Sequence, residues 1–243
     1  MIPPRAPRKR RTPRPPHPFD VLHGTDTGSL IPGDNLATGH PHDRHITAYH
    51  GTAPSLFRKL LKRWQDDYQL HPLEKTAFMD IGAGKGRAML LAAEYPFRRI
   101  VGVELHPALA AATYENMDHW QALYPDAPKM TLVEDDVMRL RIPAGPCLFF
   151  LFNPFGFVLL DRFLTHLERI FVDRPGELDI LYVNDEQRAV ITEEHPKFTQ
   201  LWRGRVHLSR EDANADKATI AHDADGMYVT VGYEDCSIYR LTR

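Results

Sequence analysis

Hydrophobic positions follow two spacings along the chain from residue 54 onward. Between residues 54 and 68, apolar side chains recur every three or four positions with Lys and Arg between them, which predicts a helix that begins at Pro54 and buries one face. Further on, stretches with helical spacing alternate with short apolar runs of strand length, at 76–81, 98–104, 129–134, 147–153 and 178–184. This alternation predicts a parallel sheet with helices on both faces.

The end of the chain has a different pattern. Residues 201–208, 227–233 and 236–241 form short strand-like runs that turn residues separate, and no helical stretch lies between the last two. We therefore predict an α/β fold with a doubly wound, mostly parallel sheet that an antiparallel strand completes at the C-terminal end.

Composition and charge limit the function classes. The chain has 243 residues, of which 43% are hydrophobic, and no stretch approaches the roughly 18 apolar residues that span a bilayer, so we predict one domain and no membrane segment. Residues 1–18 hold six Lys or Arg, seven Pro and no acid, which predicts a disordered tail. The remaining 24 basic and 32 acidic residues give residues 19–243 a net charge of −8, which excludes a basic body that grips nucleic acid. The tail is either a flexible leader or a patch that binds nucleic acid or an acidic partner.

The cysteine content indicates the compartment. Only Cys147 and Cys236 are present, and Cys147 lies within an apolar run. This pattern argues against a disulfide framework and against a thiolate zinc site, and it predicts a reducing, cytoplasmic location.

Residues 19–53 lack periodicity and are rich in Gly, Asp, Thr and His. Because they precede the domain at 54–243, we predict an ordered arm or lid that gains its structure by packing on that domain. The arm contains His40, His42, His45 and His50, without a matching carboxylate or cysteine pattern. No metal site is therefore predicted.

The stretch DIGAGKG, residues 80–86, places three glycines in a turn between a predicted strand and a predicted helix. Such a turn lets the backbone approach a ligand. A dinucleotide pyrophosphate prefers G-x-G-x-x-G, whereas the spacing here is G-x-G-x-G, and Asp80 would repel a phosphate. A carboxylate attracts an ammonium or a sulfonium group, so the turn favours S-adenosylmethionine over a nicotinamide cofactor. Lys85 and Arg87 at the helix start are expected to be solvated or packed by their stems.

Four segments in order resemble the motif series of class I S-adenosylmethionine-dependent methyltransferases: DIGAGKG, GVELHP, LVEDDV and FLFNPFG. The resemblance implies a seven-stranded Rossmann-like sheet. It also implies that Glu104 holds the ribose hydroxyls and that Asp136, followed by Val137 against the ring, meets the adenine, with Asp135 as a close rival. The cofactor-binding residues of the first motif are then Asp80, Gly82, Gly84 and Gly86.

A finer resemblance concerns the arm. FDVLHGTDTG, residues 19–28, together with DIGAGKGR is similar to strings in bacterial methyltransferases of unassigned substrate. YHGTAPSLFRKLL, followed by the glycine turn and NPFGF, is more weakly similar to lysine methyltransferases of the disruptor of telomeric silencing family. That similarity implies that Tyr49 and Thr52 close over the cofactor. Where that family has a pair of Asn residues before Phe, this chain has Asn-Pro. Because of this departure, the similarity does not establish lysine as the acceptor.

The candidate acceptor residues are Asn153, Pro154 and Phe155, which follow an apolar strand and resemble a shortened Asn-Pro-Pro-aromatic motif of amino-group methyltransferases. This resemblance favours nitrogen as the methyl acceptor, on a small molecule or a protein. In the alternative interpretation, Asn153 only ties the strand end to a loop. Asp185 and Glu186 are candidate proton acceptors.

Two other function classes remain open on the sequence. One is a cofactor-binding or partner-binding protein on the same fold with an inactive acceptor site, and the other is a nicotinamide-dependent oxidoreductase, which the glycine spacing and Asp80 disfavour.

Overall fold

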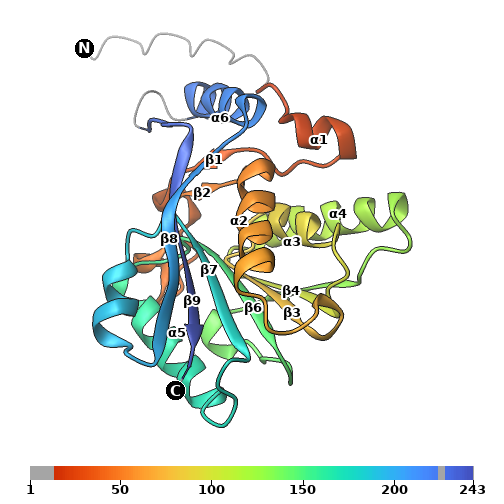
Figure 1. Cartoon of the computed structure of the whole chain (residues 1–243). Coiled ribbons are helices and arrows are strands. Elements are labelled where there is room, and N and C mark those ends of the chain that lie inside the picture. The colour runs from red at the N-terminus through yellow and green to blue at the C-terminus, as the bar shows by residue number, and fades with distance from the viewer. Residues whose placement is uncertain (1–13, 224–227, 243) are drawn as a thin grey trace, which may run out of the picture.

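The computed structural model describes residues 14–223 and 228–242, and a seven-stranded sheet lies at its centre (Figure 1). Its strands are β3 (Ala77–Ile81), β4 (Arg99–Glu104), β5 (Met130–Glu134), β6 (Cys147–Phe152), β7 (Leu178–Val183), β8 (Phe198–His207) and β9 (Tyr233–Leu241). They lie in the order β5-β4-β3-β6-β7-β9-β8. All neighbours from β5 to β7 pair in parallel, and β9 runs antiparallel to both β7 and β8. The predicted mostly parallel sheet with an antiparallel C-terminal strand is confirmed.

Helices cover both faces of the sheet because each central strand is apolar on both sides. Along β6, Leu148 and Phe150 pack into one hydrophobic cluster, whereas Phe149 and Leu151 pack into the other. The first cluster includes buried residues of α2 (Pro54–Asp67), α3 (Arg87–Ala92) and α4 (Pro107–Leu123), and the second includes those of α5 (Phe157–Ile170). Short 3-10 or π segments also occur at η3 (Leu73–Lys75), η4 (Val137–Arg139) and η5 (Val190–Glu194).

The strand predicted at 227–233 is wrong. Residues 228–231 have no regular structure, and β9 begins only at Tyr233. A helix that the pattern does not predict, α6 (Arg210–Asp223), precedes this segment. Its buried residues include the polar side chains of Asp212, Asp216 and Thr219, so α6 has no apolar stripe for a periodicity argument to detect.

The arm contains α1 (Pro18–His23), β1 (Leu30–Ile31), η1 (Gly33–Leu36), η2 (Asp43–His45) and β2 (Tyr49–His50). The strands β1 and β2 form a separate antiparallel pair. Most of the predicted tail, residues 1–13, lies outside the described residues. Arg14 forms an ion pair with Asp26, and Pro18 already belongs to α1.

The arm is fastened to the domain by Arg87, which is only 3% exposed. Its Nε donates to Thr27 Oγ1 over 2.6 Å, and its Nη2 lies 3.4 Å from Asp20 Oδ2. Asp20 also accepts from the backbone N–H groups of Thr27 and Gly28. Burial alone would raise the pKa of Asp20, but these contacts hold that pKa below its ordinary value. Of the two expectations for Arg87, solvated or packed, the structure excludes the solvated one because the arm covers this side chain.

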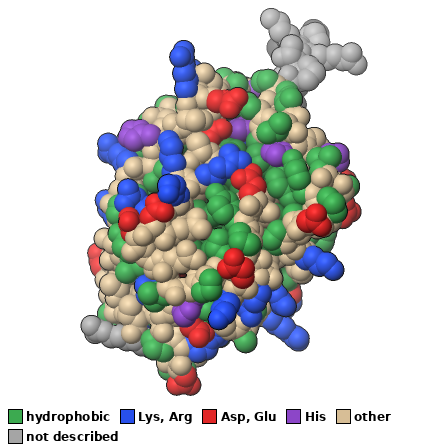
Figure 2. Space-filling model, turned by 45° about the vertical axis from the view of Figure 1, so that its right-hand side comes forward, with side chains coloured by type: hydrophobic (Ala, Val, Ile, Leu, Met, Phe, Trp, Pro, Cys, Tyr) green, Lys and Arg blue, Asp and Glu red, His purple; other side chains and the backbone are tan. Residues whose placement is uncertain are grey.

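The surface carries charged side chains of both signs (Figure 2). Figure 2 shows Lys and Arg side chains interspersed with Asp and Glu on one face, around a central group of hydrophobic side chains. No helix in residues 14–223 or 228–242 is both long and apolar enough to cross a membrane.

Asp179 on β7 links the sheet to α2 and to the C-terminal strand β9. It accepts from Trp64 Nε1 over 2.7 Å and from two nitrogens of Arg240 on β9, each over 2.7 Å. Asp179→Asn should lower the free energy of unfolding by about 3–5 kcal/mol, because it leaves the buried guanidinium without a counter-charge. Urea denaturation measures this loss. The control variant is Glu94→Gln, because Glu94 pairs with Arg58 near the surface and such pairs contribute about 0–1 kcal/mol to the free energy of unfolding. Equal losses in the two variants would contradict this assignment.

Candidate functional site

A cavity lies beyond the carboxyl ends of β3, β4, β5 and β6, and the arm covers it. Its lining combines Asp80, Gly82, Ala83 and Gly84 at the end of β3 and in the glycine turn, residues 103–106 at the end of β4, residues 135–137 after β5, and Phe150, Phe152, Pro154 and Phe155 at the end of β6 with His42 and residues 45–52 of the arm. Asn153 is not among these lining residues. This is the edge of a doubly wound sheet at which ligands bind. The fold therefore brings together the four sequence motifs and both predicted arm residues.

The glycines of the turn are explained by backbone conformation and close approach. Gly82 and Gly84 have φ of +72° and +58°, in the left-handed region that favours glycine. A Cβ on Gly84 would lie 2.1 Å from Tyr49 Cε2, and one on Gly82 would lie 3.0 Å from Pro154 Cβ. The turn thus fits beneath the arm and beside the acceptor motif only without side chains. Gly86 completes the turn with φ of +85°.

Asp80 is the second-last residue of β3, lines this cavity and is 3% exposed. Its Oδ2 is buried and has no hydrogen-bond partner among the described residues. Burial, and then the negative charge of Glu104, raise the pKa of Asp80 to about 8. A buried acceptor without a partner costs about 1–3 kcal/mol, so this position is suited to a ligand that brings a donor or a positive charge.

Glu104 ends β4 and fixes the shape of the turn. Its Oε2 accepts from Gly84 N over 2.7 Å, and its Oε1 accepts from His106 N over 2.8 Å. Burial raises the pKa of Glu104 to about 7, while these backbone N–H groups act in the opposite direction. Each carboxylate oxygen has a second lone pair, so the group can still accept from two ligand hydroxyls.

Asp135, Asp136 and Val137 all line the cavity. Asp136 caps η4, because its Oδ1 accepts from Met138 N over 2.9 Å, and its Oδ2 lies 2.9 Å from His42 Nδ1. Asp135 Oδ1 accepts from Asp136 N. Both oxygens of Asp136 therefore face protein groups in this structure, so Asp135 stays a rival for contact with a ligand.

The arm contributes Tyr49 and Thr52 to the lining. The Tyr49 hydroxyl donates to Thr27 O over 2.7 Å, and its ring lies against the glycine turn. Burial raises the pKa of Tyr49, so the phenol keeps its proton at neutral pH. The carbonyl oxygen of Thr52 lies 3.4 Å from Arg87 Nη1, which ties this part of the arm to the arginine that anchors its start.

Asn153 leaves β6 with φ of +39°. Its Nδ2 donates to Glu186 Oε2 over 2.9 Å, and its carbonyl oxygen accepts from Thr47 Oγ1 over 2.6 Å. Tyr182 OH lies 3.5 Å from Asn153 Oδ1, and Asp185 is held by Arg203 and Ser237. The structure therefore places Glu186, and not Asp185, beside the acceptor motif.

The next two residues of the acceptor motif face the cavity. Pro154 and Phe155 both line it, and Phe155 is buried against Phe163 with the ring centroids 6.0 Å apart. Ile46 forms a β-bridge with Phe155, and Gly156 N donates to His45 O over 3.0 Å. Sequence reasoning does not find the contacts of His45 and Ile46, nor those of Thr47 and Arg87, because they join residues about 35 to 110 positions apart.

Comparisons with known proteins give only distant matches. No protein-family model matches the sequence, and no curated protein matches it. Among solved structures, protein PH1948 from Pyrococcus horikoshii is similar with 14% identity and a TM-score of 0.47, over 77% of this chain and 83% of that one. N-methyltransferase NodS from Bradyrhizobium japonicum has 11% identity and a TM-score of 0.46, over 77% and 94%. The 23S rRNA methyltransferase ErmE has 14% identity and a TM-score of 0.46, over 76% of this chain and 67% of that one. Likenesses at this level describe the path of the chain, and the function has to be argued from the residues.

The buried carboxyl group of Asp80 predicts a pH dependence of stability. Its pKa is raised from an ordinary value of 3.8 to about 8, so the folded protein keeps a proton that the unfolded chain releases between these pH values. Stability from this group is thus present below about pH 4 and is lost as the pH rises toward about 8. Denaturation curves of Asp80→Asn should fall less steeply between about pH 5 and pH 8 than those of the parent. Parallel curves would contradict the assignment.

Proposed function

We propose that the protein is an S-adenosylmethionine-dependent methyltransferase. The observation that carries this proposal is the buried Oδ2 of Asp80, which has no hydrogen-bond partner among the described residues and lies with Glu104 in a cavity that the arm covers. A ligand that fits must bring a cationic donor to Asp80 and hydroxyl donors to Glu104, across the backbone of Gly84. The amino group and the ribose of S-adenosylmethionine have this chemistry, and its methyl group would then lie near Asn153 and Phe155.

The competing classes fit less well. A nicotinamide dinucleotide would bring a pyrophosphate into a turn that Asp80 and Glu104 border, where two acids repel it. A binding protein with an inactive acceptor site would not need Pro154 and Phe155 to line the cavity beside the glycine turn. That alternative is tested by methyl transfer itself.

We propose that the arm, residues 19–53, acts as the lid of this site. Three contacts support the proposal: Tyr49 covers Gly84, Thr47 donates to the carbonyl of Asn153, and Arg87 holds Thr27. Together they reach the cofactor turn and the acceptor motif from one segment. A lid of this kind excludes water from the reacting groups.

The reaction needs positioning more than proton transfer. When bound, the cofactor supplies a methyl group on a sulfonium whose positive charge disperses as the methyl moves to a nucleophile. Asp80 and Glu104 would fix its two ends, and the loop after β6 would hold the acceptor in line with the methyl carbon. Glu186 accepts a hydrogen bond from Asn153 Nδ2, and its carboxylate is our candidate to accept a proton from an acceptor amine. Nitrogen on a small molecule or a protein is the acceptor that this arrangement favours.

Binding calorimetry tests the cofactor assignment. S-adenosylmethionine and S-adenosylhomocysteine should bind, and Glu104→Gln should weaken binding by about 1.5–3 kcal/mol, the value of hydrogen bonds to a charged group. Glu134→Gln is the matched control, because Glu134 pairs with Glu104 in register on β5 but is exposed. Saturable binding of NADH without any binding of S-adenosylmethionine would refute the proposal.

Asn153→Gly tests the acceptor site, because glycine removes the side chain yet tolerates φ of +39°. We expect transfer of tritium from labelled cofactor to the acceptor-containing fraction of a cell lysate to slow at least tenfold, with cofactor affinity unchanged. Asn184→Gly, at φ of +49° after β7, is the control for backbone effects. Lower thermal stability with the parental transfer rate would show that Asn153 only ties the strand end to its neighbours.

A further inference from the structure

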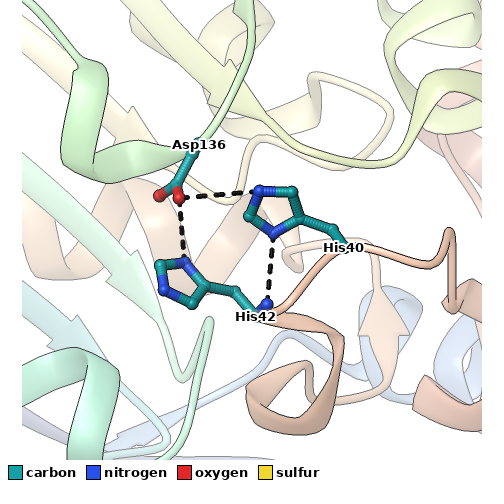
Figure 3. Close-up of side chains that lie close together, drawn as sticks. All are labelled: His40, His42 and Asp136. Atoms are coloured by element: carbon teal, nitrogen blue, oxygen red, sulfur yellow. Dashed lines mark hydrogen bonds and ion pairs between the residues drawn. The ribbon is translucent and has the colours of Figure 1, made fainter.

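Two histidines of the arm and one aspartate of the domain converge at the edge of the cavity (Figure 3). His42 Nδ1 lies 2.9 Å from Asp136 Oδ2, and His40 Nε2 lies 3.8 Å from the same oxygen. The three ligand atoms lie within 4.8 Å of one another. The prediction that the arm binds no metal rests on a missing carboxylate, and the fold supplies that carboxylate from residue 136.

The histidine rings are held in place by their own turn. The carboxylate of Asp43 accepts from the backbone N–H groups of Thr38, Gly39 and His40, which folds residues 38–43 into a compact loop. As a result the rings of His40 and His42 lie edge to face with centroids 5.2 Å apart, and both present a nitrogen to Asp136. This arrangement is set by the loop and does not depend on long, flexible side chains.

The contact between His42 and Asp136 is not a satisfactory hydrogen bond. His42 Nδ1 is buried and has no hydrogen-bond partner within residues 14–223 and 228–242, although Asp136 Oδ2 is only 2.9 Å away. Asp136 itself cannot turn freely, because its Oδ1 accepts from Met138 N at the start of η4. A nitrogen and a carboxylate oxygen that face each other at this distance without a proper hydrogen bond are placed as two ligands of one ion would be.

We propose that His40, His42 and Asp136 form a binding site for a divalent transition-metal ion of the zinc type. Two imidazole nitrogens and one carboxylate oxygen suit Zn²⁺, whereas Mg²⁺ and Ca²⁺ prefer oxygen ligands throughout. Ligands about 2.0–2.1 Å from a tetrahedral ion lie roughly 3.3 Å apart, between the 2.9 and 3.8 Å separations to Asp136. Three protein ligands leave a fourth position for water.

Binding of the ion requires local changes in protonation. His40 Nδ1 accepts from His42 N over 3.1 Å, and Arg162 Nη1 lies 3.4 Å from His42 Nε2. When the nitrogens that face Asp136 give their lone pairs to the metal, each neutral ring carries its proton on the opposite nitrogen. The hydrogen bond from His42 N to His40 Nδ1 is then lost, because Nδ1 carries a proton. The exposed Arg162 moves away from His42 Nε2 for the same reason, and the two rings release no protons in total.

The site would fasten the arm over the cavity. His40 and His42 belong to the arm, whereas Asp136 belongs to the loop between β5 and η4, so one ion joins the two sides of the cavity mouth. Asp136 would then serve the metal, and Asp135 would remain for a ligand in the cavity. The site is independent of the proposed methyl transfer, because its three ligand atoms are side-chain atoms of this chain.

Zinc titration of the untagged full chain against a chromogenic chelator tests the site without any cofactor present. We expect one Zn²⁺ per chain, with affinity at least tenfold lower in His40→Ala and in His42→Ala. His45→Ala is the matched control, because its ring centroid lies 6.1 Å from that of His42 in the same loop but outside the triad, and its affinity should stay within about twofold of the parental value.

Cobalt absorption provides the second readout, and circular dichroism shows that each variant is folded. The parent loaded with Co²⁺ should show a visible band that His42→Ala lacks. Zn²⁺ binding that is equal in the parent and in the folded His40→Ala and His42→Ala variants would overturn the site, and so would the absence of stoichiometric binding to the parent. Either result would leave the calorimetric test with S-adenosylmethionine unaffected, so failure of the metal site and failure of the proposed function are distinguishable.

Discussion

Burial of Asp80 without a partner is the constraint around which the site is organised. The carboxyl group lies near the carboxyl end of the central strand β3, between β4 and β6, and Asp80 is only 3% exposed. Leaving such a group unsatisfied lowers stability, and the fold tolerates it because β3 is paired on both sides along its whole length. Function and stability oppose each other at this residue, as is common where a protein prepares a site for a ligand.

The arm contributes to the burial of Asp80. Residues 42–52 cover the cavity in which Asp80 lies, and Arg87 helps to hold the arm there by binding Thr27 and Asp20. One buried guanidinium on α3 therefore links the string FDVLHGTDTG to the glycine turn that begins the same helix. The two sequence segments are in direct contact through Arg87 and Thr27.

The sequence predicts the elements whose side chains are sorted by hydrophobicity. The strands β6 and β7 are continuous apolar runs because both faces are buried, and α2 shows one apolar stripe because only one face is. The helix α6 escapes prediction because it buries Asp212 and Asp216, and the run at 227–233 reads as a strand from composition alone. Periodicity carries no information on such polar packing.

The residues of the candidate site also differ in whether the sequence can place them. Asp80 and Glu104 can be placed from the sequence, since the carboxyl ends of parallel strands meet at one edge of the sheet. The partners of Asn153 and Asp136 cannot, because Thr47, Glu186 and His42 come from distant segments whose approach depends on how the arm folds. Local patterns therefore locate the cofactor side of the site, whereas its cover and its acceptor side require the three-dimensional structure.

The most direct test of the central claim is a crystal structure of the full chain with S-adenosylhomocysteine. The account predicts that the amino group of the ligand lies about 3 Å from Asp80, that the ribose hydroxyls lie at a similar distance from Glu104, and that residues 42–52 cover both. A ligand bound elsewhere, or one that occupies the cavity while Asp80 still lacks a partner, would contradict it.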